Sequence, residues 1–252
     1  MTDSVKRFAI LDFGLFYVHG KGTDTDQGRM IGIPGYLIQT AEGKNILVDT
    51  GFHPKYAVDA EQATAEDQLA SFGRVERLTA ENLPSAQLAK CGLKMKDIDL
   101  LIMTHTDIDH VGGIGDFPGV PIVIHKDERA FDRPRYWNTQ PLAWPDAEYK
   151  LIETDEELMP GLTLLTTSGH APGHLSLLLQ LPETGAVLLT CDAIGRPAEL
   201  QPGGFAGSWN VAKAEASGAK LMSIAEKENA FVIYGHDPEQ WPALKKAPLW
   251  YG

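Results

Sequence analysis

An apolar stretch that runs directly into a dense group of histidines and aspartates constrains this chain most. Residues 98–103 form a short stretch that is apolar apart from Asp99, which is typical of a buried strand. The segment Thr104-His-Thr-Asp-Ile-Asp-His110 follows at once and offers four metal-ligand side chains within six residues. Because functional side chains commonly lie on loops at strand ends, this junction predicts a sheet whose edge carries a polar site.

Four other segments place histidine or aspartate beside strand-like stretches. They are Asp49-Thr-Gly51, Ser168 to His174, Cys191-Asp192 and Gly235-His236-Asp237. Histidine and carboxylate ligands together suit Zn, Fe, Mn or Co. A single tight turn cannot surround a metal ion, so ligands from distant segments must complete the site. The candidates are His170, Asp192 and His236.

The chain shows no internal repeat, low-complexity tract or linker, so we expect one domain over residues 1–252. Apolar stretches bounded by turn residues predict strands, and stretches that end at glycine predict helices. We expect strands at 8–18, 31–39, 46–49, 98–103, 121–125, 162–167, 175–181, 186–190 and 231–234. We expect helices at 65–72, at 85–91, from 126, and at 210–227 with Ser208 as N-cap. The segments 19–28 and 132–146 are expected to be loops, and the second of them a loop or flap.

Composition and charge narrow the class of protein. The chain has 252 residues, 43% of them hydrophobic, and a formal net charge of −12, which argues against nucleic acid and anionic membranes as partners. Its longest apolar runs are far below the ~20 residues that span a bilayer, and the first residues lack a signal-peptide pattern. Cys91 and Cys191 are too few for a disulfide framework, so we expect a cytoplasmic protein.

Together these motifs resemble the metallo-β-lactamase superfamily of metal-dependent hydrolases. The family signature is His-x-His-x-Asp-His, followed by a distal His, a bridging Asp and a final His. The matching positions are His105, Asp107, Asp109, His110, His170, Asp192 and His236. Three segments, 168–176, 187–192 and 234–240, are similar to those of the N-acyl-homoserine lactonase branch. The resemblance covers nearly the whole chain and implies an α+β fold, an αββα sandwich with metals at one edge between two β-sheets.

The resemblance also implies the chemistry. Two divalent cations, with zinc expected and manganese or iron as alternatives, would share a hydroxide that attacks a small-molecule lactone or related carboxylic ester. Asp192 would bridge the cations, and Asp109 or Asp192 would pass a proton to the leaving oxygen. Asp49 is expected to orient a ligand or a loop of the site without binding metal itself.

Two positions depart from the family pattern. Asp107 stands where the family has histidine, which adds negative charge and favours Mn or Fe. Its side chain is either a ligand or a nearby solvated carboxylate. Gly195 stands where the lactonase branch has a tyrosine that contacts the substrate carbonyl. Tyr136 is the candidate replacement for that hydroxyl.

Several other residues have structural alternatives. We expect His19, His53 and His125 not to bind metal, and His174 to support the site. Cys191 fits a buried core thiol better than a ligand. Loop aromatic residues either wall an apolar pocket or pack their loops on the body. They are Tyr136, Trp137, Trp144, Phe205 and Trp209.

Two rival functions stay open. The first is a hydrolase of the same fold that cleaves a thioester, a β-lactam or a phosphodiester, although the acidic balance disfavours nucleic-acid phosphodiesters. The second is a binding module with one metal or none, which Asp107 and Gly195 keep open. A flavodiiron-type role is disfavoured because no flavodoxin-like domain fits the length. The apolar tail at 244–251 leaves a homodimer open.

Overall fold

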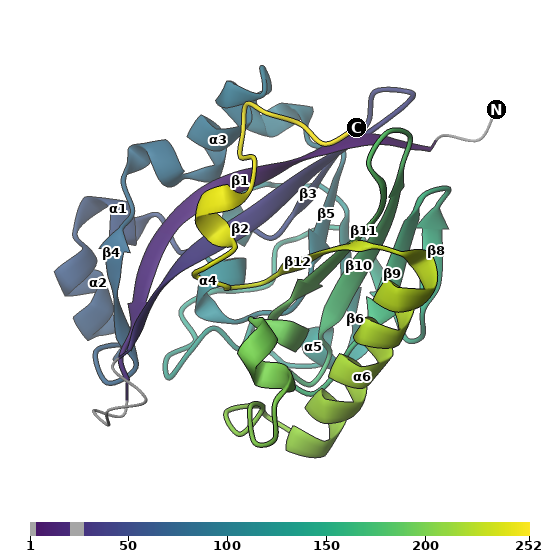
Figure 1. Cartoon of the computed structure of the whole chain (residues 1–252). Helices are drawn as coiled ribbons and strands as arrows, with labels where there is room; N and C mark the ends of the chain where they lie inside the picture. Colours follow the sequence, from purple (N-terminus) through teal and green to yellow (C-terminus); the bar gives the residue numbers. More distant parts are fainter. Residues whose placement is uncertain (1–3, 21–27) are drawn as a thin grey trace.

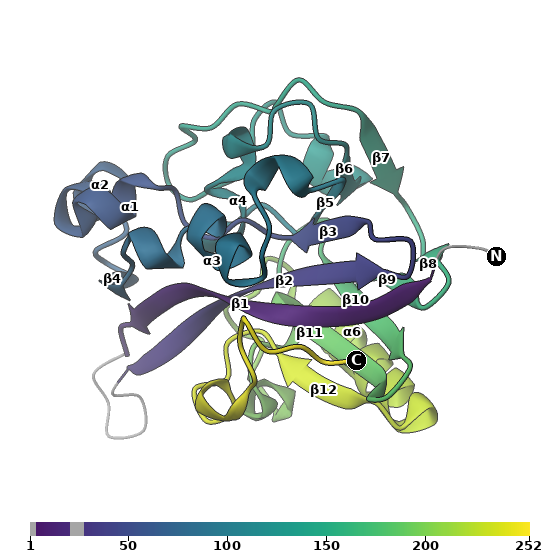
Figure 2. The same cartoon turned by 90° about the horizontal axis from the view of Figure 1, so that it is seen from above.

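Two β-sheets pack face to face, with helices outside both, in the computed structural model, which describes residues 4–20 and 28–252 (Figures 1 and 2). The larger sheet contains β1 (Val5–Val18), β2 (Arg29–Thr40), β3 (Asn45–Val48), β4 (Gly73–Arg77), β5 (Leu100–Met103), β6 (Ile122–His125) and β7 (Tyr149–Ile152). The smaller sheet contains β8 (Glu156–Met159), β9 (Leu162–Thr166), β10 (Leu175–Leu181), β11 (Gly185–Cys191) and β12 (Phe231–Tyr234). The strand orders are β4-β1-β2-β3-β5-β6-β7 and β12-β11-β10-β9-β8.

The helices cover the outer faces of the two sheets. Their bounds are α1 (Lys55–Val58), α2 (Ala60–Glu66), α3 (Pro84–Lys90), α4 (Ile108–Val111), α5 (Lys126–Arg129) and α6 (Val211–Glu228). The long helix α6 lies across the smaller sheet, whereas α1 to α3 lie on the side of the larger sheet (Figure 1). The αββα sandwich that the resemblance implied is therefore confirmed.

Alternating side chains on each strand build three apolar cores. In β1, Phe8 and Ile10 pack between the sheets, while Leu11 and Phe13 pack under the outer helices. In β11, Val187 and its alternate neighbours face the larger sheet, and Leu188 faces α6. Successive strand side chains point to opposite faces, so the central strands of both sheets are buried on both faces.

Most predicted strands are confirmed, and the errors lie where local pattern and tertiary pairing disagree. The predicted helix at 65–72 is wrong: α2 ends at Glu66, and β4 begins at Gly73 because it pairs with the end of β1. The N-cap of α6 is Asn210, which accepts the Lys213 N–H, and not Ser208. The short strands β4, β7 and β8 were not predicted. The loop at 132–146 is confirmed, and most of the predicted loop at 19–28 lies outside the described residues.

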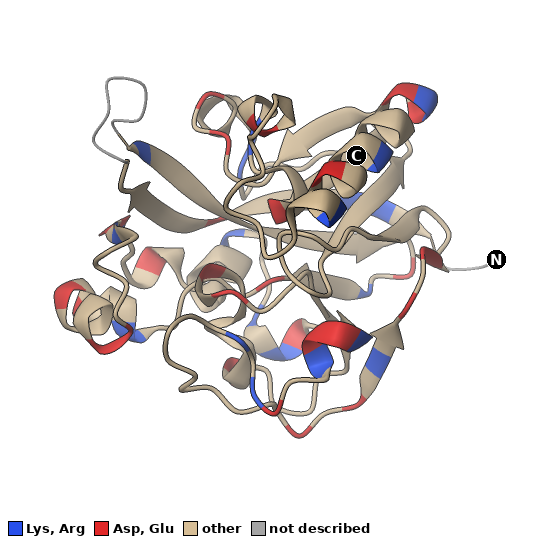
Figure 3. Cartoon of the chain, turned by 90° about the horizontal axis from the view of Figure 1, so that it is seen from below, with Lys and Arg blue, Asp and Glu red and all other residues tan. Residues whose placement is uncertain are grey.

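The surface carries charges of both signs, and its helices are short or polar. Figure 3 shows Lys and Arg interspersed with Asp and Glu over the helices and outer strands. Within residues 4–20 and 28–252, the chain has no helix with both the length and the apolar character that a membrane span requires.

Gly112 lets two site-forming loops approach closely. A Cβ atom there would lie 2.0 Å from the backbone nitrogen of His53 and 2.2 Å from the carbonyl carbon of Phe52. Because both neighbours are backbone atoms, the loops must separate to admit a methyl group. We expect Gly112→Ala to lower the free energy of unfolding by about 3 kcal/mol, as measured by urea denaturation. The control Gly115→Ala, whose Cβ would meet nothing within 4 Å, should change it by less than about 0.5 kcal/mol; equal effects would contradict the explanation.

Candidate metal centre

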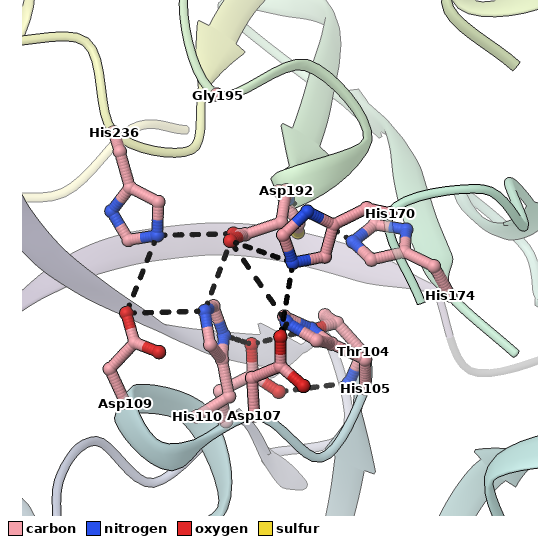
Figure 4. Close-up of polar contacts among 12 residues, drawn as sticks. Thr104, His105, Asp107, Asp109, His110, His170, His174, Asp192, Gly195 and His236 are labelled. Carbon is pink, nitrogen blue, oxygen red and sulfur yellow. Dashed lines mark hydrogen bonds and ion pairs between the residues drawn. The ribbon is translucent and has the colours of Figure 1, made fainter. Parts of the chain in front are cut away.

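Five strand ends bring the predicted site residues to one edge of the sandwich. Asp49 follows β3, the segment 105–110 follows β5, His170 follows β9, Asp192 follows β11 and His236 follows β12. Figure 4 shows the side chains of the seven predicted ligands, from His105 to His236, converging from these separate elements. All seven predicted ligands lie in the cluster, although no more than four of them are close in sequence.

The first group of donor atoms combines His105, Asp107 and His170. The Asp107 Oδ2 atom lies 3.6 Å from His105 Nε2 and 3.2 Å from His170 Nε2. These three side chains come from two strand ends and present their donor atoms to a common point (Figure 4). Asp107 therefore lies within reach of this group of donor atoms, although its side chain is shorter than that of histidine.

The second group of donor atoms combines Asp109, His110 and His236. The Asp109 Oδ2 atom lies 3.7 Å from His110 Nε2 and 3.5 Å from His236 Nε2. His236 Nδ1 donates to the Gly32 carbonyl oxygen at 2.9 Å. This contact leaves Nε2 of the same ring available to bind a metal ion.

Asp192 lies between the two groups and offers one oxygen to each. Its Oδ2 atom is 4.0 Å from His105 Nε2 and 3.5 Å from His170 Nε2. Its Oδ1 atom is 3.3 Å from His110 Nε2 and 3.1 Å from His236 Nε2. A carboxylate in this position is suited to bridge two cations.

The donor set fits divalent cations in both groups. Three buried polar atoms in the cluster lack a hydrogen-bond partner within the described part of the chain, namely His105 Nε2, His110 Nε2 and Asp192 Oδ1. Buried polar atoms are rarely left unpaired. Donor separations of 3.1 to 4.0 Å also bracket the edge of about 3.4 Å expected for ligands arranged tetrahedrally about 2.1 Å from zinc.

A buried carboxylate contacts His110 on the side of the ring that faces away from the cluster. Asp49 Oδ2 lies 2.8 Å from His110 Nδ1, and its two oxygens accept the Thr104 N–H at 2.8 Å and the Thr104 hydroxyl at 2.7 Å. The bond to Nδ1 fixes the tautomer that exposes His110 Nε2 to a metal. The predicted orienting role of Asp49 agrees with this geometry.

His174 supports Asp192 and lies outside the two groups. Its Nε2 atom accepts the Asp192 backbone N–H at 3.1 Å, and its Nδ1 atom lies 2.8 Å from the Thr167 hydroxyl. Burial, together with the charge of His170, lowers the pKa of His174 to about 3. The ring is therefore neutral, as an acceptor at Nε2 must be.

The carboxylates of the cluster favour the charged form of two histidines. Burial acts to lower the pKa of His236, but Asp192 and Asp109 raise it to about 9. Burial opposes ionisation of His110 as well, yet Asp192, Asp109 and Asp49 raise its pKa well above the ordinary range.

Metal binding is therefore expected to displace protons from these rings. A metal-bound imidazole nitrogen cannot carry a proton, and a histidine with a pKa of about 9 is charged at neutral pH. We expect the affinity for Zn²⁺ to fall as the pH is lowered from about 9 to about 6, with release of about one proton or more per chain at neutral pH. Titration in weakly buffered solution with a pH indicator measures this release, and a pH-independent affinity would contradict it.

A cavity of about 380 Å³ opens onto the cluster, which is within the range of small-molecule sites. Asp109, His170, Asp192 and His236 contribute to its wall. The remaining wall is largely apolar, with Phe16, Ile31, Phe52, Leu69, Phe72 and Trp137 among its residues. Three arginines also line it, namely Arg29, Arg135 and Arg196.

Some of the aromatic loop residues line the cavity, and others pack their loops on the body of the protein. Trp137 and Trp209 line the cavity, whereas Phe205 packs in the core under α6 and Trp144 donates its ring N–H to the Phe131 carbonyl. The proposed role of Tyr136 is wrong, because this ring is buried outside the cavity wall and its hydroxyl donates to Asp67 at 2.8 Å.

The space beside Gly195 is taken by Glu199, which sequence reasoning missed. The Glu199 carboxylate accepts the Gly195 N–H at 2.7 Å, and a Cβ on residue 195 would lie 3.1 Å from it. His53 and His125 use Nδ1 to accept backbone N–H groups of their own turns, as expected for residues outside the site.

The sequence matches the metallo-beta-lactamase superfamily over residues 32–236, and the chain belongs to this family. It is a metal-dependent hydrolase, so the alternative of a non-catalytic module is set aside.

Relatives within the family share most of the chain. An N-acyl homoserine lactonase of Bacillus cereus is 35% identical over 223 residues, which is 88% of each chain. A crystal structure of a B. thuringiensis AiiA mutant with N-decanoyl-L-homoserine at its active site has a TM-score of 0.85 at 29% identity, covering 98% of this chain and 100% of that one. An N-acyl homoserine lactone hydrolase with N-hexanoyl-L-homoserine at its catalytic metal centre has a TM-score of 0.81 at 28% identity, with coverage of 98% and 100%.

Proposed function

We propose that this chain opens the lactone ring of N-acyl homoserine lactones with two divalent cations, and that it thereby quenches quorum signals. One cation would be held by His105, Asp107 and His170, and the other by Asp109, His110 and His236. Asp192, whose two oxygens face one group each, is the observation that carries the proposal. Zinc is the expected metal, with manganese or iron as alternatives.

The residues of the site would divide the work of ester cleavage. When bound, the cations would lower the pKa of a water molecule and polarise the substrate carbonyl. Asp192 would fix the spacing between the two groups of ligands. Asp109 and Asp192 both line the cavity and would hold the proton that the leaving oxygen needs.

The apolar wall supports an acyl chain as part of the substrate. Phe72 is 44% exposed and lines the cavity with Phe52 and Leu69. Each buried methylene contributes about 0.8 kcal/mol of transfer free energy, so a decanoyl lactone should exceed a butanoyl lactone in kcat/KM by at least about tenfold. Phe72→Ala should lower the ratio of kcat/KM for the decanoyl lactone to that for the butanoyl lactone.

A substrate panel measured by acid release tests the proposal. It contains lactones of several acyl lengths, a linear ester, a thioester, a β-lactam and a phosphodiester. The proposal expects the lactones to have the highest kcat/KM. A thioester, β-lactam or phosphodiester that is hydrolysed faster than every lactone would contradict it and would favour the rival of the same fold.

We also propose a single domain that works in a reducing compartment such as the cytoplasm. Cys91 and Cys191 are free thiols, and Cys191 is buried. The tail folds back on β1, where Tyr251 pairs with Phe8 and Lys246 with Ile10, so its apolar residues are largely used within the chain. A homodimer stays a prediction that sedimentation can test.

A further inference from the structure

We propose that Arg135 is a positioning residue that holds Asp107 as a metal ligand, by offsetting the charge that aspartate brings to a position where the family has histidine. This inference rests on the proposed metal centre. It assigns a role to a residue of the 132–146 loop that no motif indicated.

The two oxygens of Asp107 face different partners. Oδ2 points into the ligand group, 3.2 Å from His170 Nε2. Oδ1 points away from that group and lies 3.3 Å from Nη1 of Arg135. One oxygen is thus directed toward the cation position while the guanidinium attracts the other, which favours binding through a single oxygen.

Backbone contacts hold Arg135 beside the ligand loop. The Arg135 N–H donates to the Thr106 hydroxyl at 3.1 Å, and the Tyr136 N–H donates to the Thr106 carbonyl at 2.8 Å. The Tyr136 hydroxyl, bonded to Asp67, secures the loop from the other side. The backbone that carries the guanidinium is therefore bonded to Thr106, the residue that directly precedes Asp107 in the sequence.

A second carboxylate faces the same guanidinium. Glu128 is fully buried, and its Oε1 atom lies 3.6 Å from Arg135 Nη1. Glu128 also accepts the backbone N–H groups of Thr106 at 3.1 Å and Gly173 at 3.3 Å. Its position is thus fixed by both ligand-bearing loops. The Arg135 guanidinium therefore lies between two carboxylates, those of Asp107 and Glu128.

The interaction of Arg135 with Asp107 is one of charge more than of directed hydrogen bonding. Nη1 is buried, yet it makes no hydrogen bond of acceptable geometry within the described part of the chain. Arginine stays protonated at all ordinary pH values. A fixed positive charge beside an aspartate ligand offsets part of the negative charge that this ligand brings in place of a neutral histidine.

Arg135 also lines the cavity, so a role in substrate binding is the competing explanation. A residue that binds only substrate would change KM and leave metal affinity unchanged. Metal affinity without substrate therefore separates the two roles.

The test measures Zn²⁺ and Mn²⁺ affinities of the full chain by competition with a chromophoric chelator. Arg135→Met removes the charge and keeps much of the length, and we expect affinity at one of the two positions to fall by roughly 10- to 100-fold. Arg135→Lys keeps the charge and should stay within about threefold of the original. Arg133→Met is the matched control, because Arg133 is an exposed arginine of the same loop and should leave both affinities unchanged.

The sign of the effect should reverse when the ligand is changed. Asp107→His places the family ligand beside Arg135, and we expect it to weaken metal binding because the guanidinium then repels the bound cation with no aspartate charge to offset it. Adding Arg135→Met to Asp107→His should restore affinity. Arg135→Met weakening binding equally in both backgrounds, or in neither, would overturn the inference while leaving the proposed function intact. A parent chain that binds fewer than two cations would overturn both.

Discussion

Replacing Asp192 by alanine is expected to remove both bound metal and lactone hydrolysis. Its two oxygens lie 3.1 Å from His236 Nε2 and 3.5 Å from His170 Nε2, so each group of ligands loses a member at once. The histidines that remain would also lose the negative charge that favours a cation. We expect kcat/KM to fall by at least about a thousandfold, which exceeds the effect typical of a residue behind a ligand, and metal content to fall below one ion per chain.

Elemental mass spectrometry and acid release measure these two quantities on the same sample. Asp127→Ala is the control, because Asp127 is an exposed carboxylate whose side chain is 50% accessible and lies outside the cavity lining. Retention of two metal ions, or of more than about a tenth of the activity, in Asp192→Ala would show that Asp192 does not bridge the site.

Asp49→Asn is expected to weaken metal binding by roughly 10- to 100-fold without unfolding the chain. Asp49 has a φ of 59°, a left-handed conformation that asparagine tolerates and alanine does not. The amide oxygen can still accept the Thr104 N–H. Its NH₂ group cannot accept from His110 Nδ1, so the ring proton moves to Nε2, the atom that faces Asp192 at 3.3 Å. A protonated Nε2 cannot bind a metal.

Chelator competition measures the affinity of this variant, and circular dichroism checks that it folds. The matched control is Asp99→Asn, since the Asp99 carboxylate accepts the Asn45 N–H at 2.8 Å at the opposite end of β3. An affinity within about threefold of the original in Asp49→Asn would mean that the tautomer of His110 does not depend on this contact.

One part of the site could be predicted from local sequence, and another part from the order of the motifs along the chain. The segment 105–110 directly follows a buried strand, so four candidate ligands could be placed from the strand-end pattern alone. His170, Asp192 and His236 lie far apart in sequence; they were candidates because a single turn cannot surround a metal ion, and the family resemblance matched them to the order of the family's ligands. The supporting role of Asp49 was part of the chemistry that the resemblance implied.

Other features depend on contacts that sequence pattern does not show. Arg135 lies 28 positions after Asp107 in the sequence, beyond α4, β6 and α5, and neither periodicity nor a motif marks it. The position of the Glu199 carboxylate is known only from the structure, in which it accepts the Gly195 N–H. The misplaced helix at 65–72 has the same cause, since β4 exists through pairing with β1 and not through its own short, polar sequence.

Metal-dependent hydrolysis of an N-acyl homoserine lactone is the most direct test of the account. The chain is stripped with a chelator, zinc is added back in steps, and acid release from the decanoyl lactone is followed at each step. We predict negligible activity in the stripped protein and a rate that reaches its plateau at two equivalents of zinc per chain. Full activity without metal, or no lactone hydrolysis at two bound equivalents, would contradict the central claim.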